Sequence, residues 1–568
     1  MSKISIRSAY AGRHVLLTGA SGFLGKVWLV MFLDHIPEVE RIYVLIRPKA
    51  RRPARKRFEK MVANSPAFRP LHEKYGADLG EFLASKVEVI EGDIGTPGLG
   101  IEPDVASSLA RDVDLVINCA GLVDFDPDLR DAVLTNVVGT NNVAEFLEGC
   151  DHAKLLHIST CYVTGTRNGT IPEKLVPNFT PNGTEFDVNA ELADIEATVA
   201  ALIEKNESPK HMGRHRKKTL KKIRERNLNV ENETLVRTVL RRVKRDALKD
   251  MMIKEGQERS YKYGWPNIYT YSKSMAESVL VNRADKLDFA VLRPAIVESA
   301  LEYPFEGWNQ GFNTCGPLSY LLGSWFRHLP VRNGNPFDII PVDYVCRAMT
   351  IAGAELMLGK AKVVYQCGSS DINQLTIDRA CDLVALAHRR HLRERGKSTI
   401  ERVLLSRWDA VPTDPEHLLS VENIRKAAKS VGKTMRGIPR GWPKSLRREA
   451  NKLADKADDV KDNLNTIDRL LTLYLPFIHD NYFVFECGAL RANEIEEPEF
   501  VFDTTAIDWR HYWLNVHVPG LRKWCFPLFE GKTPEKYHPA HPFKLPAAPA
   551  AKTPARPTVV PNPSGAAI

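Results

Sequence analysis

Tyr269 and Lys273 are the two side chains whose types and spacing most directly suggest a chemical step. They stand four residues apart in the stretch YTYSKSMAE, and residues i and i+4 share one face of a helix, whereas Tyr271 and Lys273 point apart. A tyrosine with an ordinary pKa of about 10 is a poor proton donor unless a neighbouring ammonium group stabilises its anion. The pair predicts a proton donor for the alkoxide that forms when a hydride reduces a carbonyl, although the same spacing also occurs in ordinary helices.

Two hydroxyl groups in HISTCYVTG, residues 157–165, follow an apolar strand pattern. We expect Thr160 to orient the carbonyl oxygen, with Ser159 as the alternate, because neighbouring residues on a strand point to opposite faces. The alternative interpretation is a pair of core hydroxyl groups that bond to the backbone. The predicted catalytic residues are therefore Thr160, Tyr269, Lys273 and Ser159.

A glycine-rich turn, TGASGFLGK, follows the first strand pattern and precedes a helical one. Glycine suits a tight turn, close approach of the backbone to a pyrophosphate and contact between helix and sheet, and the helix N-terminus then faces the phosphates. The order of strand, turn and helix favours a dinucleotide site over a purely structural turn. The residues of this turn that we expect at the cofactor are Thr18, Gly19, Ser21, Gly22, Phe23, Leu24 and Gly25.

Basic residues follow the second strand pattern, RIYVLIRPKA, where sites for NAD usually carry an acid that accepts from the 2′-hydroxyl. Arg47, with Lys49 nearby, suits a 2′-phosphate, so we expect NADPH; cations in a solvated loop are the alternative. Asp93, which follows the next strand pattern, would lie near the adenine amino group. The other residues expected at the cofactor are Ile94, Asn118, Ala120, Gly121, Asn136, Tyr269, Lys273 and Pro294.

The elements that must position these residues alternate along the chain. Apolar runs such as RIYVLIR, KVEVIEGD, DLVINCAG and KLLHISTCYVTG are separated by helical patterns, which predicts an α/β fold with a Rossmann-type doubly wound parallel sheet. We expect this domain over residues 1–360, with a basic helical insertion at about 191–259. A mostly helical C-terminal domain over 361–531 and a disordered tail rich in Pro and Ala over 532–568 complete the prediction.

Composition limits the class of protein. Of 568 residues, 43% are hydrophobic and 26% are charged, as in ordinary soluble globular proteins. The nine cysteines form no CxxC pair or metal-ligand spacing, so we expect a reducing compartment, no metal and no disulfide. The N-terminus lacks the pattern of a secretory signal, and no apolar segment reaches the roughly 20 residues that span a bilayer. We expect a cytoplasmic protein and leave open a peripheral contact with the inner face of a membrane.

Several stretches carry a resemblance to a known family. GASGFLG, NCAG, HISTCYVTG and YTYSK, in this order, resemble the extended short-chain dehydrogenase/reductase superfamily, whose Ser/Thr, Tyr and Lys correspond to Thr160, Tyr269 and Lys273. YVLIRPKA, YGWPNIYTYSKSMAE, LRPAIVESALEYPFEGW and IIPVDYV are similar to fatty acyl-CoA reductases, in particular to bacterial alcohol-forming ones. DTTAIDWRHYWLNVHVPGLRKW resembles the C-terminal domain of that family.

The resemblance implies NADPH-dependent reduction of a long-chain fatty acyl-CoA through an aldehyde to a fatty alcohol, with release of CoA. Tyr269 and Lys273 would serve both steps, the first of which ends in the collapse of a hemithioacetal. Cys161 lies beside Thr160, but no adjacent base is indicated, so a covalent acyl-enzyme is disfavoured. Wax ester synthesis by a partner enzyme is a further use of the product that the sequence leaves open.

Other functions remain open. A two-electron reductase would stop at the aldehyde, start from it, or use acyl carrier protein thioesters, and an extended short-chain dehydrogenase could act on another substrate. Nucleotide-sugar epimerases and dehydratases share the Tyr–Lys pair but are disfavoured by Arg47 and by the large C-terminal half. A non-catalytic cofactor sensor would not need all three catalytic positions.

The basic segments, within a net charge of +9, have three interpretations. The first is a solvated helical face, the second is contact with CoA phosphates or an anionic membrane, and the last is nucleic acid, for which no recognised module is present. The apolar residues near the C-terminal end of the second region either line an acyl tunnel or, more simply, pack in a core; they are Leu470, Leu471, Leu473 and Tyr474.

Overall fold

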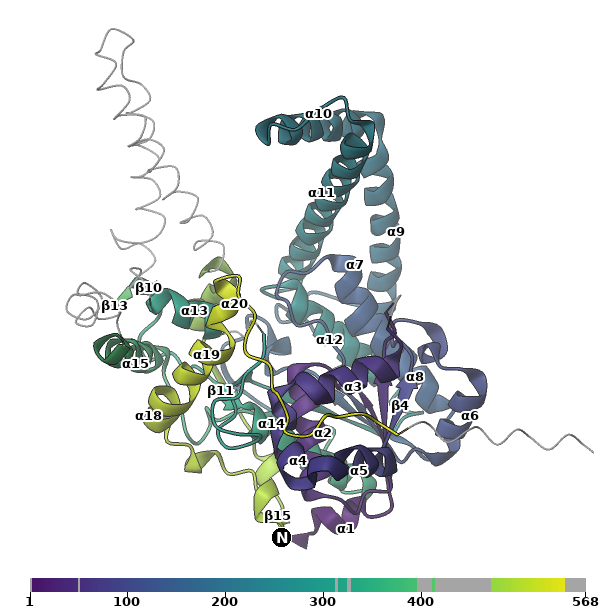
Figure 1. The fold of residues 1–568 in the computed structure, drawn as a ribbon, viewed down its shortest axis with the longest axis vertical. Coiled ribbons are helices and arrows are strands. Elements are labelled where there is room, and N and C mark those ends of the chain that lie inside the picture. Colours follow the sequence, from purple (N-terminus) through teal and green to yellow (C-terminus); the bar gives the residue numbers. More distant parts are fainter. Residues whose placement is uncertain are drawn as a thin grey trace, which may run out of the picture.

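A seven-stranded parallel sheet forms the centre of the molecule (Figure 1). The computed structural model of the protein describes residues 3–49, 52–311, 315–323, 328–395, 411–413 and 471–546. The strands of the sheet are, in chain order, β2 (His14–Thr18), β3 (Arg41–Ile46), β4 (Val87–Glu91), β5 (Leu115–Asn118), β6 (Lys154–Ile158), β8 (Phe289–Pro294) and β12 (Val364–Cys367).

The order of the strands is that of a doubly wound fold. It runs β12-β8-β6-β5-β2-β3-β4, so the chain moves outward from β2 to one edge and then continues from β5 to the other. The predicted fold class is confirmed. In open α/β sheets, ligands bind beyond the carboxyl ends of the strands at the point where the order reverses. That point lies between β2 and β5, directly after Thr18 and Asn118.

Helices cover both faces of the sheet, which is why most residues of its strands are apolar. α2 (Phe23–His35) and α14 (Val342–Met357) pack on one face, and α8 (Gly139–Glu148) and α12 (Ile268–Val281) lie on the other. On β2, Val15 and Leu17 enter the core of the first face, whereas Leu16 enters the core of the second. Packing on both faces fixes the strand ends that carry the predicted site.

The sheet extends past residue 360, where we expected the first domain to end, because its edge strand β12 pairs with β8. Short parallel pairs also join the C-terminal part of the chain to the first domain. β1 (Lys3–Ile4) pairs with β15 (Glu494–Ile495), and β7 (Gly169–Ile171) pairs with β14 (Phe483–Phe485). Two further pairs join β9 (Ile296–Glu298) to β11 (Ile339–Pro341) and β10 (His328–Pro330) to β13 (Val411–Thr413).

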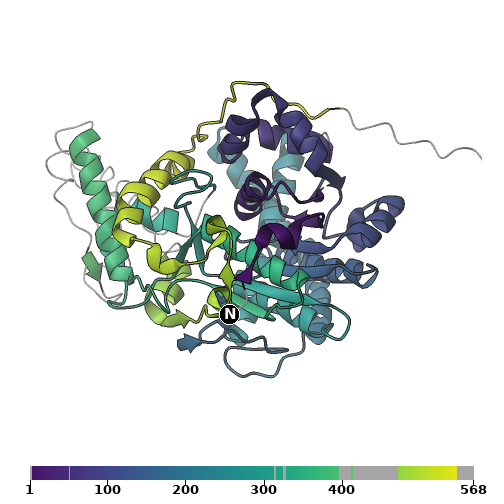
Figure 2. The same cartoon turned by 90° about the horizontal axis from the view of Figure 1, so that it is seen from below.

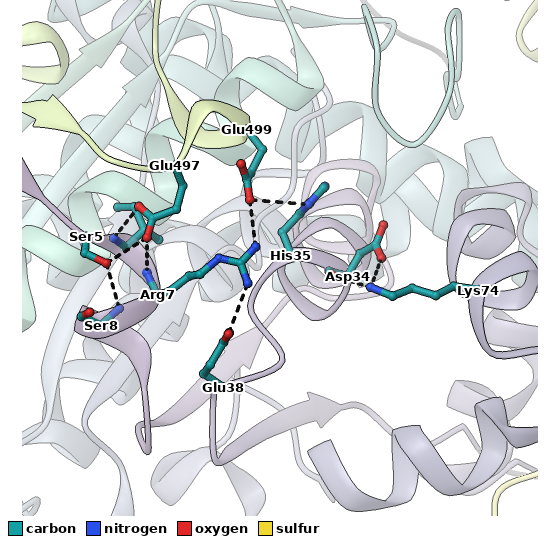
Figure 3. A network of polar contacts seen from close by, with 10 residues as sticks. Ser5, Arg7, Ser8, Asp34, His35, Glu38, Lys74, Glu497 and Glu499 are labelled. Atoms are coloured by element: carbon teal, nitrogen blue, oxygen red, sulfur yellow. Dashed lines mark hydrogen bonds and ion pairs between the residues drawn. The ribbon is translucent and has the colours of Figure 1, made fainter.

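Glu497 ties the N-terminal segment to the C-terminal part of the chain (Figure 3). Its carboxylate accepts hydrogen bonds from Ser5 Oγ at 2.9 Å and from the backbone N–H groups of Ile6 and Arg7 at 2.8 and 3.0 Å. The Arg7 guanidinium pairs with Glu499 at 3.0 Å. These contacts hold α1 (Ile6–Tyr10) beside the second region, so the two expected domains share polar contacts as well as strands.

The segment that we expected to form a basic helical insertion projects from the sheet domain as an arm of three helices (Figure 1). They are α9 (Val188–Glu207), α10 (Pro209–Glu225) and α11 (Glu233–Lys262). α11 returns to the sheet domain, and α12 begins at Ile268 soon after its end. The arm is therefore inserted directly before the helix that carries Tyr269 and Lys273.

The remaining helices surround the sheet and build the C-terminal region (Figure 2). Near the sheet they are α3 (Ala54–Asn64), α4 (Arg69–Tyr75), α5 (Leu79–Lys86), α6 (Pro103–Asp112) and α7 (Leu129–Ala132). Later in the chain they are α13 (Cys315–Leu322), α15 (Ile377–Arg395), α18 (Trp509–His511), α19 (Val518–Trp524) and α20 (Phe526–Phe529). Within the described parts of the chain, none of the helices combines the length and the apolar character needed to cross a bilayer.

Residues 532–546, which we expected to be disordered, lie along α4 and α5 as an ordered strap. Tyr537 donates a backbone hydrogen bond to Asn64, and the rings of Tyr537 and Phe543 contact His72. Leu545 is buried. Aromatic and leucine side chains among the prolines supply apolar contacts, which the Pro/Ala-rich composition alone did not predict. Residues 547–568, Leu470 and most of the basic middle of the second region lie outside the described residues.

Candidate active site

A cleft of about 460 Å³ opens at the carboxyl ends of β2, β5, β6 and β8, where this fold places its ligands. The glycine turn after β2, the loop after β5 and the N-terminal half of α12 form its walls. Eleven of the predicted residues line it: Gly19, Gly22, Phe23, Leu24, Gly25, Gly121, Ser159, Thr160, Tyr269, Lys273 and Pro294. These residues come from five separate segments of the sequence, which the fold brings together at one cleft.

The glycine turn fits a dinucleotide because there is no room in it for side chains. Gly19 has φ +76°, and a Cβ on it would lie 2.6 Å from the backbone of Cys119. A Cβ on Gly25 would lie 2.6 Å from the Gly19 carbonyl oxygen. The N-terminus of α2, capped by Gly22, faces the cleft and can bind a pyrophosphate through its free N–H groups.

Lys273 is a buried cation at the floor of the cleft. Its side chain is 4% exposed, and its Nζ donates a hydrogen bond to the Ile158 carbonyl at 2.7 Å. Burial lowers the pKa of Lys273 to about 8. A Cβ on Gly121 would come within 3.1 Å of the Nζ, so the glycine in NCAG leaves space for the lysine. An ammonium in this position can meet a ribose or a developing anion.

Tyr269 lies one turn before Lys273 on α12, whose start is capped by the Asn267 side chain. The tyrosine is half-buried and borders the cleft. Burial raises its pKa to about 12, and a hydrogen bond with Thr160 opposes this shift. Lys273 is not among the groups that shift the pKa of Tyr269 here. The predicted contribution of the lysine to proton donation therefore remains a prediction, while the Thr160–Tyr269 contact places both groups at one point.

The structure distinguishes the two candidate hydroxyl groups. Thr160 Oγ1 accepts from the Tyr162 backbone N–H at 3.3 Å, donates to the Pro294 carbonyl at 3.3 Å, and contacts Tyr269. Ser159 also lines the cleft, and its hydroxyl group has no hydrogen-bond partner among the described residues. Thr160 is thus the residue whose hydroxyl group hydrogen-bonds to Tyr269. The neighbouring hydroxyl group of Ser159 has no partner among the described residues.

Four predicted cofactor residues position the walls of the cleft instead of lining it. Thr18 Oγ1 donates to Asn118 Oδ1 at 2.8 Å and accepts from the Ala120 backbone at 3.1 Å, which links the ends of β2 and β5. Asn136 lies on the π-helical turn η4 (Val133–Val138), and its side-chain oxygen accepts from the Leu122 backbone at 2.8 Å. These side chains shape the loop after β5.

The residues predicted at the adenosine end lie at the ends of β3 and β4. Arg47 and Asp93 form an ion pair with 3.6 Å between Arg47 Nη1 and Asp93 Oδ2, and the Arg47 side chain is 65% exposed. Lys49 and Ser21 are exposed. Ile94 is buried, and its carbonyl accepts from Asn142 Nδ2 at 2.7 Å. Arg47 is therefore available to a phosphate, in exchange for or in addition to its contact with Asp93.

An aromatic wall closes the cleft on the side that the sequence did not predict. The Phe477 ring lies 5.0 Å from that of Tyr162 and 5.5 Å from that of Phe125. Tyr474 also contacts Phe125, and Tyr269 donates a backbone hydrogen bond to the Phe125 carbonyl at 3.1 Å. Leu471 and Tyr474 are buried in the main core, and Leu473 is partly buried. The apolar run near residue 470 was the one available signal of this wall.

Gln310 is a second residue that sequence reasoning missed. It lines the cleft, and its Oε1 accepts a hydrogen bond from Lys26 Nζ at 2.6 Å. Lys26 is 6% exposed, and burial lowers its pKa to about 8. The contact joins α2 to the loop before α13, two segments far apart in the sequence, so no local pattern could predict it.

Cys161 is not suited to act as a nucleophile. It is buried, its Sγ lies 2.9 Å from the Arg293 carbonyl, and burial raises the pKa of its thiol well above the ordinary value. A thiolate is therefore disfavoured at this position. The described residues include one buried group with potential metal ligands, formed by Glu298, Cys315 and His517, and it lies outside the lining of the cleft.

A family model described as male sterility protein, an NAD-binding family, matches residues 17–349. The chain belongs to the male sterility protein family. The match includes the glycine turn, Thr160 and the α12 pair, and it supports a nicotinamide cofactor. Phe477 and Tyr474 of the aromatic wall lie beyond the matched range.

Named relatives extend over nearly the whole chain. Probable fatty acyl-CoA reductase 5 of Arabidopsis thaliana is 29% identical over 527 residues, 90% of this chain and 96% of the relative. The alcohol-forming fatty acyl-CoA reductase of Simmondsia chinensis is 26% identical over 543 residues, 91% of this chain and 98% of the relative. Among solved structures, the terminal R domain of the myxalamid PKS-NRPS pathway aligns with a TM-score of 0.49 at 17% identity, covering 92% of this chain and 93% of that one.

Proposed function

We propose that this protein reduces long-chain fatty acyl-CoA with NADPH, through an aldehyde, to a fatty alcohol and releases CoA. The observation that carries the proposal is the contact of Tyr269 with Thr160 at a cleft that also contains the glycine turn. The similarity to fatty acyl-CoA reductases over 90% of the chain supports the substrate class. The aromatic wall, with Phe125 and Phe477, gives the cleft an apolar side suited to an acyl chain.

The residues of the chain supply binding, orientation and a proton. When bound, the nicotinamide cofactor supplies the hydride. Thr160 and Ser159 present hydroxyl groups to the substrate oxygen, and Tyr269 donates the proton that this oxygen needs. With a pKa of about 12, Tyr269 is protonated at neutral pH and can act as the donor. Lys273, charged below about pH 8, stabilises the tyrosinate that forms as the proton leaves.

The reaction balances over two reductions. In the first, one hydride and one proton convert the thioester to a hemithioacetal, whose C–S bond then breaks to give the aldehyde and the thiol of CoA. In the second, another hydride and another proton convert the aldehyde to the alcohol. Each reduction consumes one NADPH and one proton. Because both add hydride to a carbonyl carbon and a proton to its oxygen, Thr160 and Tyr269 serve both.

The preference for NADPH over NADH forms part of the proposal. Arg47 follows β3 with its guanidinium exposed, and its described partner is Asp93 at 3.6 Å. A 2′-phosphate would give this arginine a stronger, charge-assisted partner than the partly exposed carboxylate.

The decisive experiment measures the NADPH oxidised and the CoA released from palmitoyl-CoA by the purified protein, with the organic product identified by mass. Two NADPH per CoA with hexadecanol supports the proposal. One NADPH per CoA with hexadecanal assigns a two-electron reductase instead. No oxidation with any acyl thioester would move the protein to another substrate on the same scaffold. The Tyr269→Phe variant is the control for background oxidation.

A further inference from the structure

α10 carries a continuous line of cations along one face. Its residues at positions i, i+4, i+7, i+11 and i+14 share one helix face. These are Lys210, Arg214, Lys217, Lys221 and Arg224, and all five are exposed. The opposite face, with His215, Thr219 and Ile223, is buried against the rest of the arm.

Acidic groups do little to offset this line within α10. The helix contains one acid, Glu225, which lies 3.8 Å from Lys221 in an exposed i,i+4 ion pair. Such a pair contributes little to stability and leaves both groups in contact with water. Positive charge therefore dominates this face, at the end of the arm farthest from the sheet (Figure 1).

An apolar side chain stands beside the cations at the tip. The loop after α10 exposes 46% of Leu228, two residues after the exposed Arg226. Cations beside an exposed leucine match the interface of an anionic bilayer, where the charges meet headgroups and the leucine reaches the acyl boundary. α10 contains no Phe, Tyr or Trp on which the bases of a single-stranded nucleic acid could stack.

The base of the arm is fixed to the active site by buried polar contacts. Glu191 accepts a hydrogen bond from Tyr271 at 2.5 Å and pairs with Arg259 at 2.8 Å, which ties α9, α11 and α12 together. Gln257 Nε2 donates to Asp126 Oδ2 at 2.7 Å, next to the cleft-lining Phe125. A surface that holds α10 would therefore also set the orientation of the cleft.

We propose that the cationic face of α10 docks on an anionic lipid bilayer and so presents the cleft to that membrane at a fixed orientation. This surface is separate from the cleft and does not depend on the reaction that the cleft performs. If the proposed function is also correct, docking brings the enzyme to the phase in which a long-chain alcohol accumulates.

The test is co-sedimentation of the whole protein with phosphatidylcholine vesicles, with and without phosphatidylserine. The substitutions Lys217→Gln, Lys221→Gln and Arg224→Gln, made together, should lower partitioning onto the anionic vesicles roughly 100-fold, at about 1 kcal/mol for each cation near such a surface. The matched control neutralises three exposed cations elsewhere, Arg111→Gln, Lys286→Gln and Arg510→Gln, and should retain wild-type partitioning. Neither variant should change kcat with dispersed palmitoyl-CoA.

Three results would overturn the proposal. Equal binding to neutral and anionic vesicles would remove the electrostatic basis. Equal losses in the arm variant and the control variant would make the effect one of net charge. Unchanged vesicle binding in the arm variant, together with lost binding to single-stranded DNA, would assign α10 to nucleic acid. Because these assays need no turnover, they remain informative even if palmitoyl-CoA is not a substrate.

Discussion

Lys273 in the cleft and the cations of α10 place positive charge in opposite surroundings. Lys273 is 4% exposed, its ammonium bonds to a backbone carbonyl, and burial lowers its pKa to about 8. The five cations that share one face of α10 are all exposed, and the helix contains one acid. A single buried charge acts strongly on the groups next to it. Exposed charges are screened by salt within about 10 Å at 0.1 M, so they have a substantial effect only when several act together.

The difference separates what each region can do. A buried ammonium is costly to desolvate and therefore responds to any anion that forms beside it, which suits a proton-transfer site. A row of hydrated ammonium and guanidinium groups loses little on exposure and gains from each headgroup that it meets. Changes in the cleft should alter turnover without altering docking, and changes in the arm should do the reverse.

Tyr269→Phe is the sharpest way to break the cleft half of this comparison. Removing the proton donor should lower kcat about 1,000-fold, within the usual range for general acid catalysis. Binding of NADPH, followed by fluorescence titration, and partitioning onto anionic vesicles should both remain. Near wild-type turnover would contradict the role assigned to this tyrosine.

Lys273→Met should lower kcat about 100-fold and remove a pH dependence. In the wild type, Lys273 loses its charge as pH rises through about 8, so kcat should fall above that pH. Stability should move the other way, because between about pH 8 and 10.5 the unfolded chain binds more protons than the folded one, so the free energy of unfolding rises with pH. A pH–kcat profile and urea titrations of both proteins check this; a profile unaltered by the substitution would count against it.

Tyr271→Phe gives a matched change two residues from Tyr269, at the base of the arm. Tyr271 is fully buried and donates to Glu191 at 2.5 Å. Removing this donor from a buried carboxylate should lower the free energy of unfolding by roughly 1–3 kcal/mol, measured by urea denaturation, while substantial turnover remains. Loss of turnover equal to that of Tyr269→Phe, with unchanged stability, would reverse the assignments of the two tyrosines.

Arg47→Ser tests a third kind of cation. Arg47 is exposed like the cations of α10, but like Lys273 it is proposed to act on a single group, the 2′-phosphate. The ratio of kcat/KM for NADPH to that for NADH should fall roughly tenfold, the equivalent of one charge-assisted hydrogen bond. Arg111→Ser, at another exposed arginine, should leave the ratio unchanged. An unchanged preference for NADPH in Arg47→Ser would contradict the role of Arg47 and assign the 2′-phosphate to another group, such as Lys49.

Local patterns predicted those parts of the site that depend on neighbours in the sequence. Apolar periodicity located the strands, and the spacing of Tyr269 and Lys273 selected the tyrosine that borders the cleft. The glycine turn was predictable because a Cβ at Gly19 or Gly25 would strike the backbone. Each of these features depends on the geometry of a single strand, turn or helix.

Features that depend on contact between distant segments were not predictable. The aromatic wall needs Phe477 against Tyr162, and the Lys26–Gln310 hydrogen bond joins two segments separated by most of the sheet domain. Asn136 and Thr18 were assigned to the cofactor but support the loop after β5, since hydrogen-bonding side chains next to a site carry the same signal as those within it. The strap was missed because the Pro/Ala composition outweighed three apolar side chains.

The contact of Glu497 with the N-terminal segment has a consequence for how the chain is made. The Ile6 backbone N–H bonds to a carboxylate 491 residues later in the sequence. At about 5–20 residues per second, synthesis leaves Ile6 without this partner for on the order of 25–100 s. During that interval the backbone N–H groups of Ile6 and Arg7 lack their carboxylate partner, whereas Tyr10 can already pack against Phe32 of α2. The attachment of the N-terminal segment to the C-terminal part of the chain is therefore a late step, which waits for the synthesis of Glu497.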